Sequence, residues 1–460
     1  MPNEQALPTL AFDRGTLVVT GMARRLGEPF TWDARTGQWR CHARHHAAVC
    51  QVLRGHIQDT LPTPREVHWP RVEVPRLRQD QLEALTAWEE AGRRGQIIMP
   101  TGTGKTIVAL AAMARCQTAT LVVAPIRDLM YQWHRRIGQA LGYNAGILGD
   151  GRHEIHAVTV TTYDSAYIHM ERMGDRFGLV IFDEEHHLPG PSLRQAAEFC
   201  AAGWRMGLTA TPERFDGEQV YLDELIGPVA YRQDIADARG VTLAEYQTVR
   251  IPVALRDAEQ RRYDTLSRQV RTFVMNRRKD HAAYRWEDVC KEAGHDPDAR
   301  RALRAFHAKA AIETRAAEKL RVLEDLFRLH AHEQVLVFTG SNQMALNVAQ
   351  RFLIPLIIDK IGKCERERIL DGFGAGRFRA LVANQVLDEG IDVPAVKVGV
   401  VLGGFGSPRQ AKQRLGRILR KSARTTAVLY EVVCQETREE LRSRSRRRSD
   451  AFQGTRHLHL

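Results

Sequence analysis

The stretch QIIMPTGTGKTIVALAAMA, residues 96–114, decides how this chain folds. An apolar run leads into a glycine-rich turn, and an apolar segment with helical character follows. Such a turn closes backbone N–H groups around phosphates, and the next helix adds its positive N-terminus. We therefore predict a phosphate-binding loop for ATP and Mg²⁺, although Met99 replaces the usual first glycine. A plain turn with a surface lysine is the weaker interpretation. The predicted ligands are Thr101, Gly102, Thr103, Gly104, Lys105 for the β- and γ-phosphates, and Thr106 for Mg²⁺.

A second stretch, LVIFDEEHHLPG at residues 179–190, ends an apolar run with three carboxylates and two histidines. Beside a phosphate-binding loop, Asp183 would hold Mg²⁺ through its water shell, and Glu184 would orient and deprotonate the attacking water. A zinc protease would instead need H-E-x-x-H, whereas His186 and His187 are adjacent. We interpret His186 as a coupling residue between nucleotide and nucleic acid, and His187 as a packing or surface histidine.

Apolar runs alternate with helical segments in two series, which predicts an α/β chain with two parallel-sheet lobes. The first series is QIIMP, LVVAP, AVTVTT, LVIFD and MGLTAT, and the second is VLVF, LIPLIID, RALVAN, VGVVL and AVLYEVV. FTW and QWR around DARTG indicate a hairpin in a small N-terminal α+β module. The predicted domains are the module at 1–75, lobe 1 at 76–240, lobe 2 at 241–435 with a helical insertion at 256–325, and a mobile basic tail at 436–460.

The composition is that of a globular chain with a polyanionic partner. Of 460 residues, 43% are hydrophobic, and we find neither a run of transmembrane length nor a secretory signal. The seven cysteines are dispersed, which predicts reduced thiols of a cytoplasmic protein. The net charge is +12, and after residue 254 Lys and Arg outnumber Asp and Glu by 40 to 26. This excess favours a phosphate backbone as partner, although arginine-rich helices are often only solvated faces.

Several ordered motifs resemble those of superfamily 2 helicases, whose lobes are RecA-like. TGTGKT after a proline is similar to motif I of that superfamily, and DEEHH is similar to motif II. LRQDQLEAL, APIRDLMYQW, TTYDSA, LTATP and VLVFTGS resemble other motifs in the family's order. The resemblance implies nucleotide contacts for Arg78 and Gln81, with Gln81 on adenine. It also implies coupling or nucleic-acid contacts for Pro125, Arg127, Thr162, Thr209 and Thr211.

Two motifs late in the chain resemble helicase motifs V and VI. LVANQVLDEGIDVP would bring Gly390 and Asp392 to the nucleotide, and QRLGRILRK would bring Gln413, Arg417 and Arg420. Alone, QRLGRILRK reads as an amphipathic basic helix. If lobe 2 closes over the loop, Arg417 and Arg420 reach the γ-phosphate, and such arginines contribute roughly 10³–10⁵ in rate.

Within the superfamily, DEEHH with QRLGRILRK looks most like the XPB group of DNA repair and transcription translocases. That group carries an Arg-Glu-Asp element, and here ERFDG matches Arg214 and Asp216 but has Phe215 in place of the acid. Phe215 could stack on a base or be buried behind the loop. The resemblance implies a thumb at 256–325, where Arg277, Arg278 and Lys279 meet phosphates or form a solvated face, and a damage-recognition-like module at the N-terminus.

These features predict an ATP-dependent DNA helicase or translocase in DNA repair, acting on single-stranded, duplex or forked DNA. An RNA helicase, or a scaffold that ATP switches without unwinding, is the alternative. A nuclease partner is implied by family analogy only. We expect no membrane association, and a cytoplasmic or nucleoid location.

Overall fold

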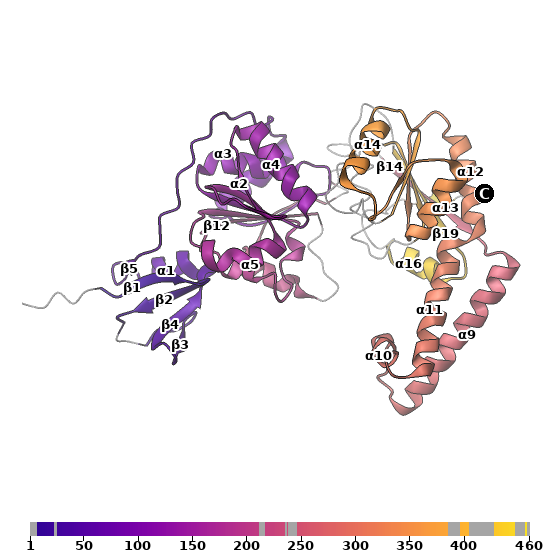
Figure 1. Cartoon of the computed structure of the whole chain (residues 1–460), viewed down its shortest axis with the longest axis horizontal. Helices are drawn as coiled ribbons and strands as arrows, with labels where there is room; N and C mark the ends of the chain where they lie inside the picture. The colour runs from indigo at the N-terminus through magenta and orange to yellow at the C-terminus, as the bar shows by residue number, and fades with distance from the viewer. Residues whose placement is uncertain are drawn as a thin grey trace, which may run out of the picture. The chain divides into compact units, whose positions relative to one another are not determined.

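The computed structural model describes residues 7–22, 25–210, 217–234, 237, 246–384, 396–403, 427–446 and 456–457. The chain divides into two compact units, residues 1–234 and 235–460, which we describe separately (Figure 1). Within the described residues, no helix is both long and apolar enough to span a bilayer.

The first unit begins with a small five-stranded sheet of order β3-β4-β2-β1-β5. The hairpin expected around DARTG is present, because β3 and β4 pair antiparallel. The helix α1 follows the 3₁₀ turn η1 and covers a core of few residues, including Leu10, Leu17 and Val49. The elements are β1 (Thr9–Asp13), β2 (Thr16–Thr20), β3 (Thr31–Asp33), β4 (Gln38–His42), η1 (Ala43–His45), α1 (His46–Val52) and β5 (Gln58–Asp59).

The segment after β5 belongs with the larger sheet of this unit. Val67 N donates to Gln117 O at 2.9 Å, and Glu73 N donates to Ala140 O at 2.7 Å. Val67 is also part of the main core of that sheet. Residues 67 and 73 therefore pack on the larger sheet, although both lie within the range 1–75 predicted for the N-terminal module.

The main sheet of the first unit has the order β13-β6-β12-β11-β7-β10-β8-β9 and confirms the predicted parallel α/β fold. One face packs against α2, α3 and α4 through residues such as Trp88, Met113 and Trp133. The other face packs against α5, α6 and α7 through residues such as Met170 and Ala197. Because both faces are covered, the central strands β7 and β11 are buried along their whole length and are mostly apolar.

The elements of this sheet and its helices follow in chain order. They are α2 (Gln79–Glu90), β6 (Arg94–Ile98), α3 (Lys105–Cys116), β7 (Thr120–Ala124), α4 (Arg127–Leu141), β8 (Gly146–Gly149), β9 (Arg152–His153), β10 (Val158–Thr162), α5 (Tyr163–Met173), β11 (Leu179–Asp183), η2 (Glu185–His187), α6 (Gln195–Glu198), β12 (Trp204–Thr209), η3 (Glu218–Val220), α7 (Tyr221–Leu225) and β13 (Val229–Arg232).

The second unit contains a parallel sheet of order β16-β17-β15-β18-β19-β14-β20. The strand β14 pairs with β19, so residues 246–253 belong to this sheet, as expected. Its described elements are β14 (Tyr246–Val253), α9 (Asp257–Asp280), α10 (Trp286–Glu292), α11 (Pro297–Arg315), α12 (Ala317–Leu329), β15 (Val335–Thr339), α13 (Asn342–Phe352), β16 (Leu356–Ile357), α14 (Lys363–Gly374), β17 (Ala380–Ala383), β18 (Val398–Leu402), β19 (Ala427–Cys434), α16 (Arg438–Arg446) and β20 (Arg456–His457).

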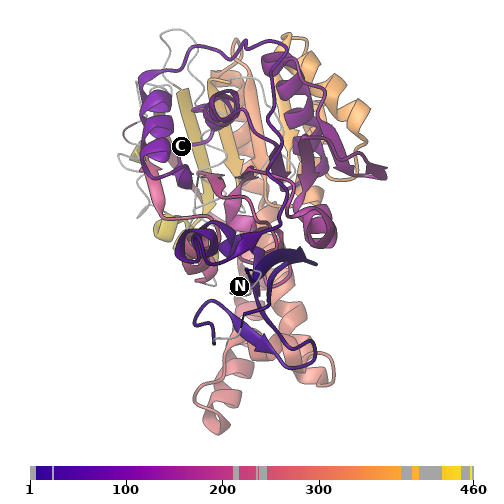
Figure 2. The ribbon, with the colours of Figure 1, turned by 90° about the vertical axis from the view of Figure 1, so that its left-hand side faces the viewer.

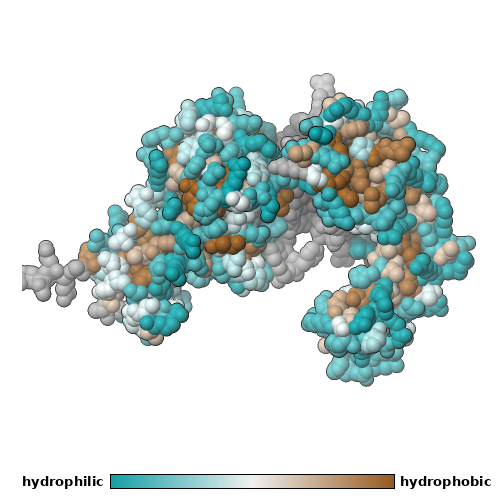
Figure 3. All heavy atoms as spheres, viewed as in Figure 1, coloured by the Kyte–Doolittle hydropathy of each residue, from teal (hydrophilic) through white to brown (hydrophobic). Residues whose placement is uncertain are grey.

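The helical insertion consists of α9, α10 and α11. The long helices α9 and α11 run side by side away from the sheet of their unit (Figures 1 and 2). A separate small core of Tyr284, Val289 and Ala302 holds α10 against them. Hydrophilic side chains gather at the far tip, as Figure 3 shows.

Residues 438–446, part of the segment that we expected to be a mobile tail, are helical. Arg438–Arg446 forms α16, which is anchored by a buried ion pair of 2.7 Å between Lys319 Nζ and Glu439 Oε2. Ser443 is also buried and donates to Glu431 Oε2 at 2.7 Å. Composition misled the prediction, because Glu439 and Ser443 of this basic segment are buried.

Candidate nucleotide and coupling site

The phosphate-binding loop connects the end of β6 to the start of α3. Gly102 and Gly104 have φ angles of 88° and 83°, a region that favours glycine. A Cβ atom on Gly104 would lie 2.5 Å from Gln81 Nε2, so this close approach also requires glycine. The hydroxyl of Thr103 donates to Pro100 O at 2.7 Å, which fixes the turn from within.

Gln81 and Arg78, on and before α2, hold the loop from the side. The Gln81 side chain is 1% exposed and donates from Nε2 to Thr103 O at 2.9 Å. Arg78 also donates to Thr103 O and pairs with Asp80 at 3.2 Å. Both residues predicted to contact the nucleotide therefore lie at the loop, although a contact of Gln81 with adenine stays a prediction.

Strand register brings the second motif to the same edge of the sheet. The strand β12 pairs with β11 and β6 in parallel, with Asp183 opposite Leu208 and Thr209 opposite Ile98. The carboxyl ends of these strands therefore meet, as expected for a ligand site of an open α/β sheet. Lys105 donates to Met99 O at 3.0 Å, and its charge partly opposes the rise that burial causes in the pKa of Asp183.

Asp183 is held by two aromatic residues that the sequence did not single out. Trp133 Nε1 donates to Asp183 Oδ2 at 2.7 Å, and Tyr163 OH donates to Asp183 O at 3.0 Å. Burial raises the pKa of Asp183, while the hydrogen bond from Trp133 opposes that rise. Trp133 stood within APIRDLMYQW, but only the packing of α4 on the sheet shows that its indole reaches the acid.

The remaining DEEHH residues form a connected group. Glu184 has a positive φ of 50°, which turns the chain sharply after β11. His186 is fully buried, and its Nδ1 lies 3.0 Å from Thr209 Oγ1 and 3.4 Å from Glu184 Oε2. His187 is half-buried, and its ring centroid lies 4.4 Å from that of His186, with the two rings tilted by 41°.

Glu185 is a further acid that sequence analysis left without a role. Its side chain is fully buried, and neither carboxyl oxygen has a hydrogen-bond partner among the described residues. Burial, together with the charges of Glu184 and Asp223, raises its pKa well above the usual range. Gly207 makes room for it, since a Cβ there would lie 1.5 Å from Glu185 Oε2.

The predicted nucleic-acid contacts of this unit also lie at the carboxyl edge of the sheet. Pro125 and Arg127 follow β7, and Thr162 ends the adjacent β10 opposite Ala124. Arg127 is exposed and pairs with Asp150 at 2.7 Å. Thr162 caps α5 by accepting a 3.3 Å hydrogen bond from Ser165 N.

In the insertion of the second unit, the three predicted basic residues differ in environment. Arg277 contributes to the local fold, because it pairs with Asp296 and, at 3.3 Å, with Glu292. Arg278 donates to Tyr284 O at 3.1 Å but is exposed, as is Lys279. The other predicted site residues lie outside the described residues: Thr211, Arg214, Phe215, Asp216, Gly390, Asp392, Gln413, Arg417 and Arg420.

Among the described residues, one group of at least three His, Cys, Asp or Glu side chains converges as metal ligands would, namely His46, Cys50 and Asp59 of the N-terminal module. The roles of Asp183 and Glu184 as nucleotide-site acids stay predictions.

Three family models match parts of the chain. Residues 75–214 match the type III restriction enzyme res subunit, and residues 302–456 match the ERCC3/RAD25/XPB C-terminal helicase. Residues 10–57 match the damage recognition domain of the xeroderma pigmentosum group B helicase. The last match covers the module whose resemblance to such a domain the sequence suggested.

Named relatives extend over most of the chain. The DNA 3′–5′ translocase XPB2 of Sulfurisphaera tokodaii is 40% identical over 392 residues, which cover 85% of this chain and 88% of that protein. The DNA 3′–5′ helicase XPB of Kineococcus radiotolerans is 32% identical over 393 residues, covering 82% of this chain and 63% of that protein.

Solved structures with this fold are more distant. Dbp5 of S. cerevisiae, bound to RNA and ADP BeF3, has a TM-score of 0.56 at 16% identity over 83% of this chain and 89% of that one. The Hef helicase domain of Pyrococcus furiosus has a TM-score of 0.51 at 17% identity over 80% of this chain and 98% of that one. At these identities the likeness concerns the fold alone, and it confirms the predicted fold of two RecA-like lobes. The chain is 40% identical to the XPB2 translocase of Sulfurisphaera tokodaii and covers 88% of that protein. It therefore belongs to the XPB family of DNA helicases and translocases.

Proposed function

We propose that this chain hydrolyses ATP at the loop of its first unit and uses the cycle to move along DNA. The observation that carries the proposal is the meeting of the loop lysine, the acids after β11 and Thr209 at one sheet edge. A nucleotide bound at this edge lies beside the strand ends that carry the predicted nucleic-acid contacts, so its hydrolysis can change the position of those contacts.

The residues at the loop fit a triphosphate with Mg²⁺. Gly102 and Gly104 adopt the left-handed backbone that turns N–H groups toward an anion, and α3 adds its N-terminus. The buried Thr101 Oγ1 has no hydrogen-bond partner among the described residues. Thr106 and Asp183 would hold Mg²⁺, which supplies positive charge that neutralises the phosphates.

Each residue around the nucleotide then has one proposed role. Lys105 exchanges its carbonyl partners for phosphate oxygens, and Glu184 accepts the proton of the attacking water. Trp133 keeps the Asp183 carboxylate in one orientation. These roles are proposals that rest on position and chemistry.

The link to nucleic acid runs through His186 in this proposal. Its imidazole joins Glu184 to Thr209, so a change at the nucleotide alters the end of β12. Pro125, Arg127 and Thr162 stand at neighbouring strand ends, where backbone phosphates would be gripped without regard to sequence.

The contribution of the second unit to the site is inferred from its sequence motifs. We propose that Gly390, Asp392, Gln413, Arg417 and Arg420 contribute from motifs V and VI. Arg417→Ala should reduce ATP turnover while ATP still binds. Near-normal turnover would remove the arginine from this role.

DNA is the proposed track because the relatives named above are DNA enzymes, whereas the RNA-bound structure shares only the fold. We further propose 3′–5′ movement, after the names of those relatives, and a role in repair. The nuclease partner stays a prediction from family analogy.

The experiment compares ATP turnover with single-stranded DNA, duplex DNA, forked DNA and RNA, followed by strand displacement on the strongest DNA activator. The proposal expects at least one DNA to stimulate turnover well above RNA. Equal stimulation by RNA, or none by any DNA, would overturn it.

A further inference from the structure

The N-terminal module has a smaller apolar core than its neighbour in the same unit. Seven buried residues make up its cluster, namely Leu10, Leu17, Val19, Leu26, Cys41, Val49 and Leu53. Its last strand, β5, is two residues long and, within the described part of the module, pairs with β1 alone. Small domains commonly gain stability from a covalent or metal crosslink, because so little apolar surface is buried.

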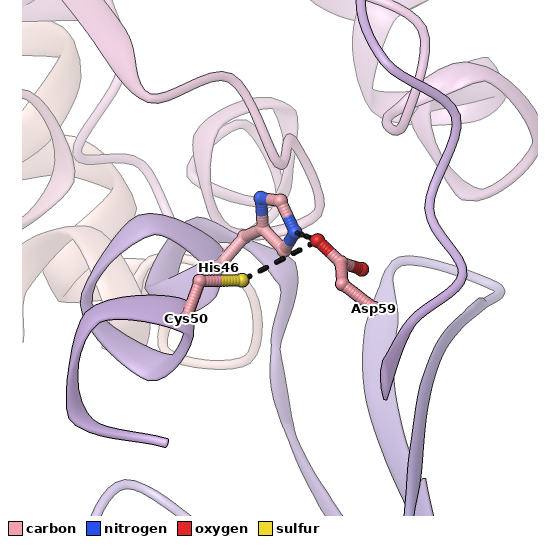
Figure 4. A group of neighbouring side chains, drawn as sticks. All are labelled: His46, Cys50 and Asp59. Carbon is pink, nitrogen blue, oxygen red and sulfur yellow. Dashed lines mark hydrogen bonds and ion pairs between the residues drawn. The ribbon is translucent and has the colours of Figure 1, made fainter. Parts of the chain in front are cut away.

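Three side chains of different chemistry converge beside this short strand. His46 and Cys50 lie four residues apart on one face of α1, and Asp59 comes from β5 (Figure 4). Asp59 Oδ2 lies 2.8 Å from His46 Nε2 and 3.4 Å from Cys50 Sγ. All three ligand atoms lie within 4.8 Å of one another.

The second oxygen of Asp59 is already fixed by the backbone. Leu61 N donates to Asp59 Oδ1 at 3.0 Å, which leaves Oδ2 directed at the histidine and the cysteine. Metal-binding carboxylates are commonly oriented in this way by a hydrogen bond to the oxygen that does not bind.

We propose that His46, Cys50 and Asp59 bind one Zn²⁺ ion that staples α1 to β5. Imidazole nitrogen, thiolate sulfur and carboxylate oxygen are ligands that Zn²⁺ accepts together, and a water fills the fourth position. Ligand atoms around tetrahedral Zn²⁺ stand about 3.5 Å apart, so small side-chain rotations bring these three into place. This proposal is independent of the motor function.

The ion would replace the proton that Cys50 now shares with Asp59. On binding, the Cys50 S–H proton leaves to solvent and a Zn–S bond forms, while the His46 proton that faces Asp59 moves to the other ring nitrogen, so that Nε2 can bind the ion with no change of oxidation state.

The test uses the full chain without an affinity tag, first dialysed against a chelator and then titrated with Co²⁺ in place of Zn²⁺. Thiolate-bound Co²⁺ gives a sulfur-to-metal charge-transfer band, which reports Cys50 directly. We expect one tightly bound Co²⁺ with this band, displaced by one equivalent of Zn²⁺. Cys50→Ser should abolish the band, and Asp59→Asn should weaken binding at least about tenfold.

The control is Cys290→Ser, which removes an exposed cysteine of α10 in the other unit and should leave the band unchanged. Circular dichroism of each variant checks that it is folded, and Zn²⁺ should raise the melting temperature of the unchanged chain but not of Cys50→Ser. The proposal is overturned if the unchanged chain shows no thiolate band, or if the band survives Cys50→Ser.

Discussion

His186 Nδ1 lies 3.0 Å from Thr209 Oγ1, and both side chains are fully buried. The pair joins the turn after β11 to the end of β12, and the same nitrogen lies 3.4 Å from Glu184 Oε2. A satisfied buried polar pair holds its two elements rigidly together, and we propose that this one couples the nucleotide to the nucleic acid.

Replacing His186 should separate ATP turnover from movement. We expect His186→Ala to retain at least about a third of the turnover without DNA and to lose most DNA stimulation and strand displacement, because the link to Thr209 is gone while Lys105 and Asp183 remain. Paired ATPase and strand-displacement assays measure this. His187→Ala is the matched control, and it should affect both assays less. Equal losses in the two variants would contradict the coupling role.

Trp133 should matter through one hydrogen bond to Asp183. Trp133→Phe keeps an aromatic ring in the core but removes the indole N–H, and a hydrogen bond to a charged group contributes about 1.5–3 kcal/mol. We expect the Mg²⁺ concentration for half-maximal turnover to rise roughly tenfold or more.

Trp69→Phe serves as the control for Trp133, because the Trp69 Nε1 atom is buried without a hydrogen-bond partner among the described residues. The same chemical change there should leave the Mg²⁺ dependence as it was. If both variants shift it equally, the effect comes from packing and not from Asp183.

The buried pair Lys319–Glu439 should anchor α16. Lys319→Met leaves Glu439 buried without its cation, so we expect a loss of about 3–5 kcal/mol in the free energy of unfolding. Chemical denaturation measures it. On α12, the helix that carries Lys319, Arg328→Met breaks an exposed pair with Glu324. This control should cost at most about 0.5 kcal/mol. Similar small losses in both variants would favour the mobile tail that composition suggested.

Glu185 should make stability depend on pH. Its folded pKa is raised above the ordinary 4.5, so the folded chain binds more protons than the unfolded chain, and stability falls as pH rises above that value. Glu185→Gln removes the titrating group. We expect its denaturation midpoint to fall less than that of the unchanged chain between pH 5 and about 8, since the difference isolates this acid. Parallel pH profiles of the two chains would show that folding does not raise the pKa of Glu185.

The sequence predicted the sheets and the nucleotide loop because both depend on local pattern. QIIMPTGTGKT specifies a strand, a glycine turn and a helix within eleven residues. The roles of Trp133 and Tyr163 could not be predicted, since their contact with Asp183 depends on how α4 and α5 pack on the sheet. α16 was missed for the same reason, because its partner Lys319 lies 120 residues away.

The most direct test of the account is ATP turnover by Lys105→Ala beside the unchanged chain, each with and without single-stranded DNA, together with DNA binding by both. Lys105 lies in the loop, donates to Met99 O at 3.0 Å and acts on the buried Asp183. The account predicts DNA-stimulated turnover for the unchanged chain, and for Lys105→Ala almost no turnover with DNA binding retained. Turnover that survives in Lys105→Ala would contradict it, because the nucleotide would then be hydrolysed elsewhere.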